Sequence, residues 1–108
     1  MVVQQANQSS FEQEVLSSRQ PVICLFWTGY CSACKQTHAT ISNMEKRLGD
    51  SARFWSVNVE EHPEIGDAAG ILVVPTIIVF RNGRPTARVF GKLPEDELFQ
   101  TIEEAIIS

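Results

Sequence analysis

The stretch VICLFWTGYCSACK, residues 22–35, contains the two signals from which the fold is predicted. Residues 22–27 form a continuous apolar run of strand length, which is typical of a strand buried on both faces, as in a parallel sheet. From Ser32 to about Arg47 the pattern is helical, with apolar residues at spacings of three and four, and Gly49 is placed to end the helix. The stretch therefore predicts a strand followed directly by a helix, with two cysteines at the junction.

The rest of the chain alternates between helix and strand signals. Ser9 and Glu12 form a capping-box pattern at the start of a short helix, and Asn82-Gly83 is a hairpin-turn signal. Strands alternating with helices require right-handed crossovers and a parallel core, and the hairpin adds antiparallel strands. We therefore expect a three-layer α/β/α sandwich around a mixed four- or five-stranded sheet. Further strands are expected at residues 2–4, 54–59, 76–80 and 87–90, and further helices at residues 11–16, at 63–69 and from Pro94 onward.

Composition indicates one acidic globular domain. The 108 residues are one domain's length, and 44% hydrophobic against 20% charged residues favour a folded chain. Nine basic and thirteen acidic residues give a net charge of −4, which argues against nucleic acid or an anionic membrane as the main partner. Three cysteines are too few, and odd in number, for a disulfide framework. Residues 1–10 lack a targeting pattern, and no apolar run approaches the about 20 residues that span a bilayer, so we expect a cytoplasmic monomer.

Cys31 and Cys34 have the spacing for reversible disulfide formation. Both lie where the predicted helix begins, and there the free backbone N–H groups and the helix dipole favour negative charge on the first sulfur. This environment is expected to lower the pKa of the Cys31 thiol, and the thiolate is the species that attacks a disulfide. We expect Cys31 to attack, and Cys34, one turn into the helix and less exposed, to resolve the mixed disulfide.

Beside the cysteine pair, the chain carries further short motifs in a characteristic order. They are Phe26-Trp27, Cys31, Cys34, Lys35, Val74-Pro75-Thr76, Asn82-Gly83 and Gly91. In this order and spacing the chain resembles the thioredoxin family. The resemblance implies a thioredoxin fold for residues 1–108 as a single domain, and a protein-disulfide oxidoreductase that uses no bound cofactor and no metal. The implied partners are disulfide-containing client proteins and a thioredoxin reductase or other dithiol donor.

The resemblance also implies roles for residues around the two cysteines. Pro75 is expected to follow a cis peptide bond, to face the cysteine pair and to shape a groove for an extended client segment. Trp27 and Lys35 are implied as supporting residues, although a tryptophan at this place is equally consistent with the core. The groove is expected to be lined by Tyr30, Val73, Val74, Pro75, Phe90 and Gly91.

Two departures from the family's pattern change the expected chemistry. Ser32-Ala33 stands where members usually have Gly-Pro, and the lost φ constraint should make the potential less reducing than that of thioredoxin. Leu25 and Ser56 stand where members usually have a buried aspartate and its lysine partner. Because that aspartate is thought to help deprotonate the resolving thiol, we expect mixed disulfides to be released slowly.

Other chemistry-bearing residues receive structural interpretations. Cys24 lies inside the apolar strand and is expected to be a small buried hydrophobe. A zinc site could be formed by Cys31, Cys34 and His38, with Cys24 or His62 as a fourth ligand. The chain lacks, however, the second ligand pair typical of a structural zinc site. The basic residues Arg81, Arg84, Arg88 and Lys92 are expected to form a solvated face, with a docking patch for an acidic partner as the alternative. The acidic residues Glu60, Glu61, Glu64 and Asp67 are likewise expected to form a solvated face.

Three functions remain compatible with the sequence. The first is an exchange enzyme that works through Cys31 and Cys34. The second is a redox-sensing or partner-docking module with little turnover, which the missing aspartate and the unusual Ser32-Ala33 keep open. The third is metal carriage by the two thiols.

Overall fold

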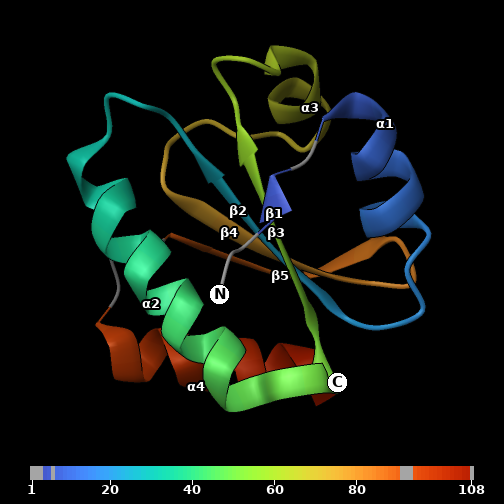
Figure 1. The fold of residues 1–108 in the computed structure, drawn as a ribbon, viewed down its shortest axis with the longest axis vertical. Coiled ribbons are helices and arrows are strands. Elements are labelled where there is room, and N and C mark those ends of the chain that lie inside the picture. The colour runs from blue at the N-terminus through green and yellow to red at the C-terminus, as the bar shows by residue number, and fades with distance from the viewer. Residues whose placement is uncertain (1–3, 6, 91–93, 108) are drawn as a thin grey trace.

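A computed structural model describes residues 4–5, 7–90 and 94–107, and its centre is a five-stranded mixed sheet (Figure 1). The strands lie in the order β1-β3-β2-β4-β5, with β1, β3 and β2 parallel and with β4 and β5 antiparallel to their neighbours. This topology confirms the predicted mixed sheet. The strand predicted at residues 2–4 is found at Gln4–Gln5, and residues 2 and 3 lie outside the described ranges. The strands are β1 (Gln4–Gln5), β2 (Val22–Trp27), β3 (Arg53–Asn58), β4 (Thr76–Arg81) and β5 (Arg84–Phe90).

Helices cover both faces of the sheet and make the predicted three layers (Figure 1). On one face α2 (Ser32–Leu48) and α4 (Glu95–Ile107) bury residues such as Ile41 and Ile102. On the other face, α1 (Gln8–Ser10), its π-helical continuation η1 (Phe11–Leu16) and α3 (Pro63–Ala68) bury Phe11 and Ile65. A short 3-10 turn, η2 (Gly49–Ser51), leads from α2 into β3. Within the described residues, no helix combines the length and apolarity needed to cross a membrane.

The central strand β2 explains why its sequence is continuously apolar. Ile23 and Leu25 pack beneath α2 and α4, whereas Val22, Cys24 and Phe26 pack beneath α1, η1 and α3. A strand with helices on both faces has no polar side, and all five of these side chains are buried. The strand predicted at residues 54–59 is β3, and it is likewise buried from its second position onward.

The chain begins its first helix two residues earlier than the predicted capping box. The Asn7 backbone N–H donates to Ser10 Oγ at 2.9 Å, and the Ser10 N–H donates to Asn7 Oδ1 at 2.9 Å. This reciprocal pair satisfies backbone donors that the first helical turn leaves free. The capping box predicted at Ser9 and Glu12 is therefore wrong, because the helix already starts at Gln8.

Glycine and proline mark the other element boundaries close to their predicted places. Gly49 ends α2 with φ +56°, and its N–H donates to the Glu45 carbonyl. Asn82 and Gly83, at φ +54° and +79°, form the tight turn between β4 and β5, as their types predict. Pro94 directly precedes α4, and its carbonyl oxygen accepts a hydrogen bond from the Leu98 N–H at 2.9 Å. Pro94 therefore caps the helix, whereas the sequence predicted that the helix begins with it.

Candidate active site

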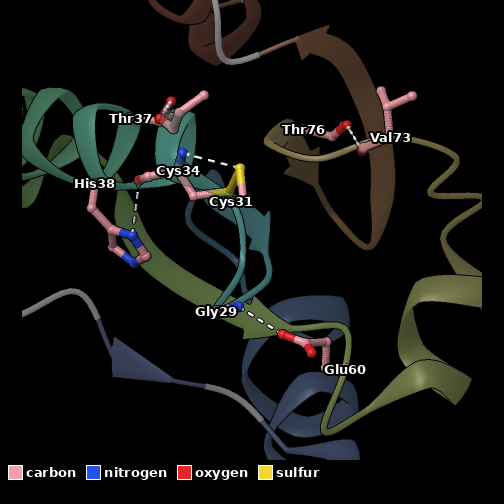
Figure 2. The surroundings of a disulfide bond; sticks show 9 residues. Gly29, Cys31, Cys34, Thr37, His38, Glu60, Val73 and Thr76 are labelled. Atoms are coloured by element: carbon pink, nitrogen blue, oxygen red, sulfur yellow. Dashed lines mark hydrogen bonds between the residues drawn. A yellow bond between two sulfur atoms is a disulfide. The ribbon is translucent and has the colours of Figure 1, made fainter.

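The register of the sheet brings three chain segments to one edge. In the antiparallel pair of β2 and β4, Phe26 lies opposite Thr76, and Thr76 also lies opposite Phe90 of β5. Just beyond these positions, β2 leads into residues 28–31, β4 is entered from residues 71–75, and β5 ends. The cysteine pair, the segment before β4 and the end of β5 therefore gather at the same edge of the sheet, and Figure 2 shows the first two of them.

Cys31 and Cys34 are joined by a disulfide, with their Cα atoms 5.2 Å apart, as their spacing predicts (Figure 2). Cys31 caps α2, since its Sγ accepts a hydrogen bond from the Cys34 backbone N–H at 3.1 Å. Cys31 is half-buried, whereas Cys34 is only 2% exposed. A protein approaching from solvent can therefore reach the Cys31 sulfur more readily than the Cys34 sulfur.

The segment before β4 has the geometry that the resemblance implies. The Val74–Pro75 peptide bond is cis, and Pro75 is buried. Thr76 Oγ1 donates to the Val73 carbonyl at 2.6 Å and ties the segment to the start of β4 (Figure 2). Val74 is half-buried, and Val73 is 51% exposed.

Two aromatic side chains of the expected groove stand in solvent at the same edge of the sheet. Tyr30 is 92% exposed and Phe90 is 59% exposed. Tyr30 directly precedes Cys31, and Phe90 lies opposite Thr76 in the sheet register. The remaining expected groove residue, Gly91, lies outside the described residues.

Trp27 and His38 pack against each other beside the cysteine pair. Their rings meet edge to face with centroids 5.2 Å apart, and His38 Nδ1 lies 3.2 Å from the Cys34 carbonyl oxygen. Trp27 is half-buried against the core beneath α2 and α4, and its buried Nε1 has no hydrogen-bond partner among the described residues. Trp27 therefore both fills the core and borders the site, while Lys35 is exposed.

Two buried residues, Leu25 and Ser56, occupy the positions where the resemblance implies an aspartate and its lysine partner. Leu25 and Ser56 lie opposite each other in β2 and β3, and both are buried. Leu25 packs in the cluster beneath α2, the helix that carries Cys34. The position of the usual aspartate is thus occupied by a hydrocarbon side chain.

Cys24 has the environment of a structural cysteine, as predicted. It is fully buried on the opposite face of the sheet, among residues such as Phe11 and Val57. Burial raises the pKa of its thiol well above the ordinary value, since no water solvates the thiolate. Among the residues that the structure describes, no three His, Cys, Asp or Glu side chains are grouped so that they hold a metal ion.

Two charged side chains on the expected solvated faces also bind backbone groups, one before Cys31 and one before β4. Glu60 Oε1 accepts a hydrogen bond from the Gly29 N–H at 2.7 Å, just before Cys31 (Figure 2). Arg88 Nη2 donates to the Ala69 carbonyl at 2.6 Å, in the segment that leads to the cis peptide bond. Both side chains are exposed, as expected of a solvated face, and these hydrogen bonds are made in addition. Their partners are backbone groups distant in the sequence, so no motif could have indicated them.

Comparison with known proteins gives one consistent result. A protein-family model described as Thioredoxin matches residues 2–104. A thioredoxin from Griffithsia pacifica is 32% identical over 108 residues, which cover 100% of this chain and 99% of the relative. A thioredoxin from Rhodospirillum rubrum is 29% identical over 104 residues, 96% of this chain and 100% of the relative. Thioredoxin 1 from Nostoc sp. is 31% identical over 100 residues, 93% of this chain and 94% of the relative.

Proposed function

Because this chain belongs to the thioredoxin family, as a thiol–disulfide oxidoreductase with the dithiol Cys31–Cys34, we propose that Cys31 attacks client disulfides and that Cys34 resolves them. The unequal exposure of the two cysteine residues carries this assignment of roles. The Cys31 sulfur also accepts the Cys34 N–H at the start of a 17-residue helix. A backbone donor and the positive end of the helix dipole both stabilise a thiolate at that place.

The exchange proceeds in two displacements that conserve electrons and protons. The Cys31 thiolate attacks one sulfur of the client disulfide, the client S–S bond breaks, and the first client thiolate leaves and takes up a proton. The Cys34 thiol then loses its proton and attacks the Cys31 sulfur, which releases the second client thiolate, and this thiolate also takes up a proton. Counting the proton that Cys31 lost when it became a thiolate, the protein dithiol loses two electrons and two protons, and the client gains the same number. A thioredoxin reductase or other dithiol donor restores the reduced protein.

The client segment is proposed to lie in an extended conformation beside the cis peptide bond. Exposed apolar side chains of Tyr30, Val73 and Phe90 support this position, because they stand at the edge of the sheet that carries the disulfide. Backbone groups beside Pro75 offer pairing by strand addition. Val74 completes the proposed groove within the described residues, with Gly91 beyond them.

Resolution of the mixed disulfide is proposed to be slow in this protein. The buried Leu25 places no carboxylate beneath the helix of Cys34, so the Cys34 proton must pass to water or another group.

We also propose that Ser32-Ala33 makes the reduction potential of the Cys31–Cys34 pair less reducing than about −270 mV, the reference value of thioredoxin. Equilibration with glutathione measures that potential, and a value at or below thioredoxin's contradicts the proposal.

An insulin-reduction assay with serine variants of the two cysteines tests the proposed roles. Turnover that requires both Cys31 and Cys34 supports the exchange enzyme. Cys34→Ser should accumulate a covalent client adduct through Cys31, whereas Cys31→Ser should form none. Negligible turnover of the unmodified protein, together with trapping by Cys34→Ser, would instead favour a docking module. We propose that residues 1–108 perform this reaction as one domain and as a cytoplasmic monomer.

A further inference from the structure

We propose that Arg88 is a positioning residue for the exchange reaction, and that the loop it holds selects clients with an apolar side chain beside their disulfide. The loop comprises residues 69–75, between α3 and β4, and its apolar contact is made by Leu72 and Val73. This inference rests on the proposed function, because it names the class of client that the Cys31–Cys34 pair serves.

Arg88 holds the first part of this loop from a neighbouring strand. It lies on β5 opposite Ile78, and its guanidinium reaches across to two successive carbonyl groups. Nη2 donates to the Ala69 carbonyl at 2.6 Å, and Nη1 donates to the Gly70 carbonyl at 3.4 Å. The first distance is short even for a hydrogen bond from a charged donor, and the planar fork of arginine allows both bonds at once.

The rest of the loop is tied by two further hydrogen bonds. The Ile71 N–H donates to the Gly66 carbonyl at 2.9 Å, and the Ile71 side chain packs against the core beneath α3. Thr76 Oγ1 holds the Val73 carbonyl. With Ile71 turned inward and both flanks fixed, Leu72 is left 95% exposed between them. No sequence motif includes this leucine, although it is the most exposed large apolar side chain among the described residues.

The chemistry of the loop indicates what kind of segment covers Leu72. Residues 71–76 carry no charge, and neither do residues 28–30 on the other side of the cysteines. An apolar client side chain that covers Leu72 and Val73 removes two apolar surfaces from water, whereas a charged one loses hydration without gaining a partner. The register places Thr76, which directly follows this loop, at the edge that carries the disulfide, so the end of the loop lies within reach of a client bound at Cys31.

The test compares three disulfides with the pre-reduced protein. Two are synthetic peptides with one internal disulfide, identical except for Leu or Glu next to one cysteine, and the third is bis(2-hydroxyethyl) disulfide, which has no side chains. Initial rates are measured by acid quenching and mass spectrometry. We expect the Leu peptide to react about tenfold faster than the Glu peptide, and Leu72→Ser to reduce this ratio to about twofold or less.

The Arg88 variants test positioning separately from contact. Arg88→Ala should raise KM, here the Leu-peptide concentration that gives half the maximal single-turnover rate, about fivefold, with a much smaller change in the maximal rate. Arg88→Lys should recover part of the loss through one remaining donor. Hydrogen exchange at residues 70–73 should be faster in Arg88→Ala, while exchange in β2 stays slow. Arg84→Ala, another exposed arginine of β5, and Ile107→Ser, an 81% exposed apolar residue at the far end of α4, are matched controls with unchanged selectivity.

Three outcomes overturn the inference. Equal rates for the two peptides refute the client class, and a KM in Arg88→Ala equal to that in Arg84→Ala refutes positioning. A dimer of the wild-type protein that Leu72→Ser abolishes would show that a second copy covers the leucine. If Arg88→Ala fails to fold, Arg88→Lys and Leu72→Ser decide the same questions. Bis(2-hydroxyethyl) disulfide separates failure of this inference from failure of the proposed function. If the protein reduces it and needs both cysteines to do so, the proposed function stands even where the inference fails. If the protein does not reduce it, the proposed function is overturned.

Discussion

Replacing Glu60 with alanine tests how the loop before the cysteines is held. Glu60 Oε1 accepts the Gly29 N–H at 2.7 Å and thereby joins residues 31 positions apart. Both residues are exposed, so water competes for each group, and the net contribution is about 1 kcal/mol rather than the 1.5–3 kcal/mol typical of hydrogen bonds to charged groups. A loss of about 1 kcal/mol lowers the unfolding midpoint of a chain of this length by about 4–8 °C.

Calorimetry on three variants measures this contribution. Glu60→Ala should show the full loss, and Glu60→Gln should show about half of it, because the amide keeps an acceptor oxygen without the charge. Glu61→Ala is the matched control: Glu61 is the exposed neighbour, and its carboxylate has only a 3.4 Å contact with Asn58 Nδ2. If Glu60→Ala and Glu61→Ala unfold at the same temperature, the loop is not held by this bond and the reasoning fails.

Three further predictions concern glycine geometry, a buried charge and the buried Leu25. Gly83→Ala should lower the free energy of unfolding by about 2 kcal/mol, because φ is +79° and the added Cβ meets the Leu16 carbonyl oxygen at 2.5 Å. Gly49→Ala, at φ +56° in open space, should cost about 1 kcal/mol, and equal losses in urea titrations would contradict this. Burial raises the pKa of the Glu45 carboxyl, so its ionisation destabilises the fold above the folded-state pKa and has no effect below the unfolded value. Glu45→Gln should therefore raise the midpoint at neutral pH but not below about pH 4, and an equal gain at both pH values would exclude the charge as the cause. Leu25→Asp should cost about 3 kcal/mol or more, because the carboxylate enters an apolar cluster. In the folded variant it should nevertheless speed release of a mixed disulfide in stopped-flow measurements, and a folded variant with the wild-type rate would refute the role given to Leu25.

The parts of the fold that follow a local pattern could be predicted from the sequence. The apolar run of β2 indicated a strand covered on both faces, and Asn82-Gly83 indicated a turn with two left-handed residues, because the backbone conformation there depends on residue type. The cysteine spacing at a helix start likewise indicated a bridge that the structure contains. In each of these cases the information lies within a few neighbouring residues.

The contacts that could not be predicted join a side chain to the backbone of a distant segment. Glu60 and Arg88 have the same local sequence character as charges in water, and only the fold brings them to Gly29 and Ala69. Leu72 was missed for a related reason. It stands in a long apolar run, where only the inward packing of Ile71 and the two tethered flanks determine which side chain is left outside.

The third cysteine keeps the redox couple of this protein chemically simple. Cys24 is buried on the opposite face of the sheet from the helix that carries Cys34, and burial raises the pKa of its thiol, which disfavours the reactive thiolate. We therefore expect oxidation of the folded protein to return the Cys31–Cys34 bridge, without isomers that involve the third sulfur.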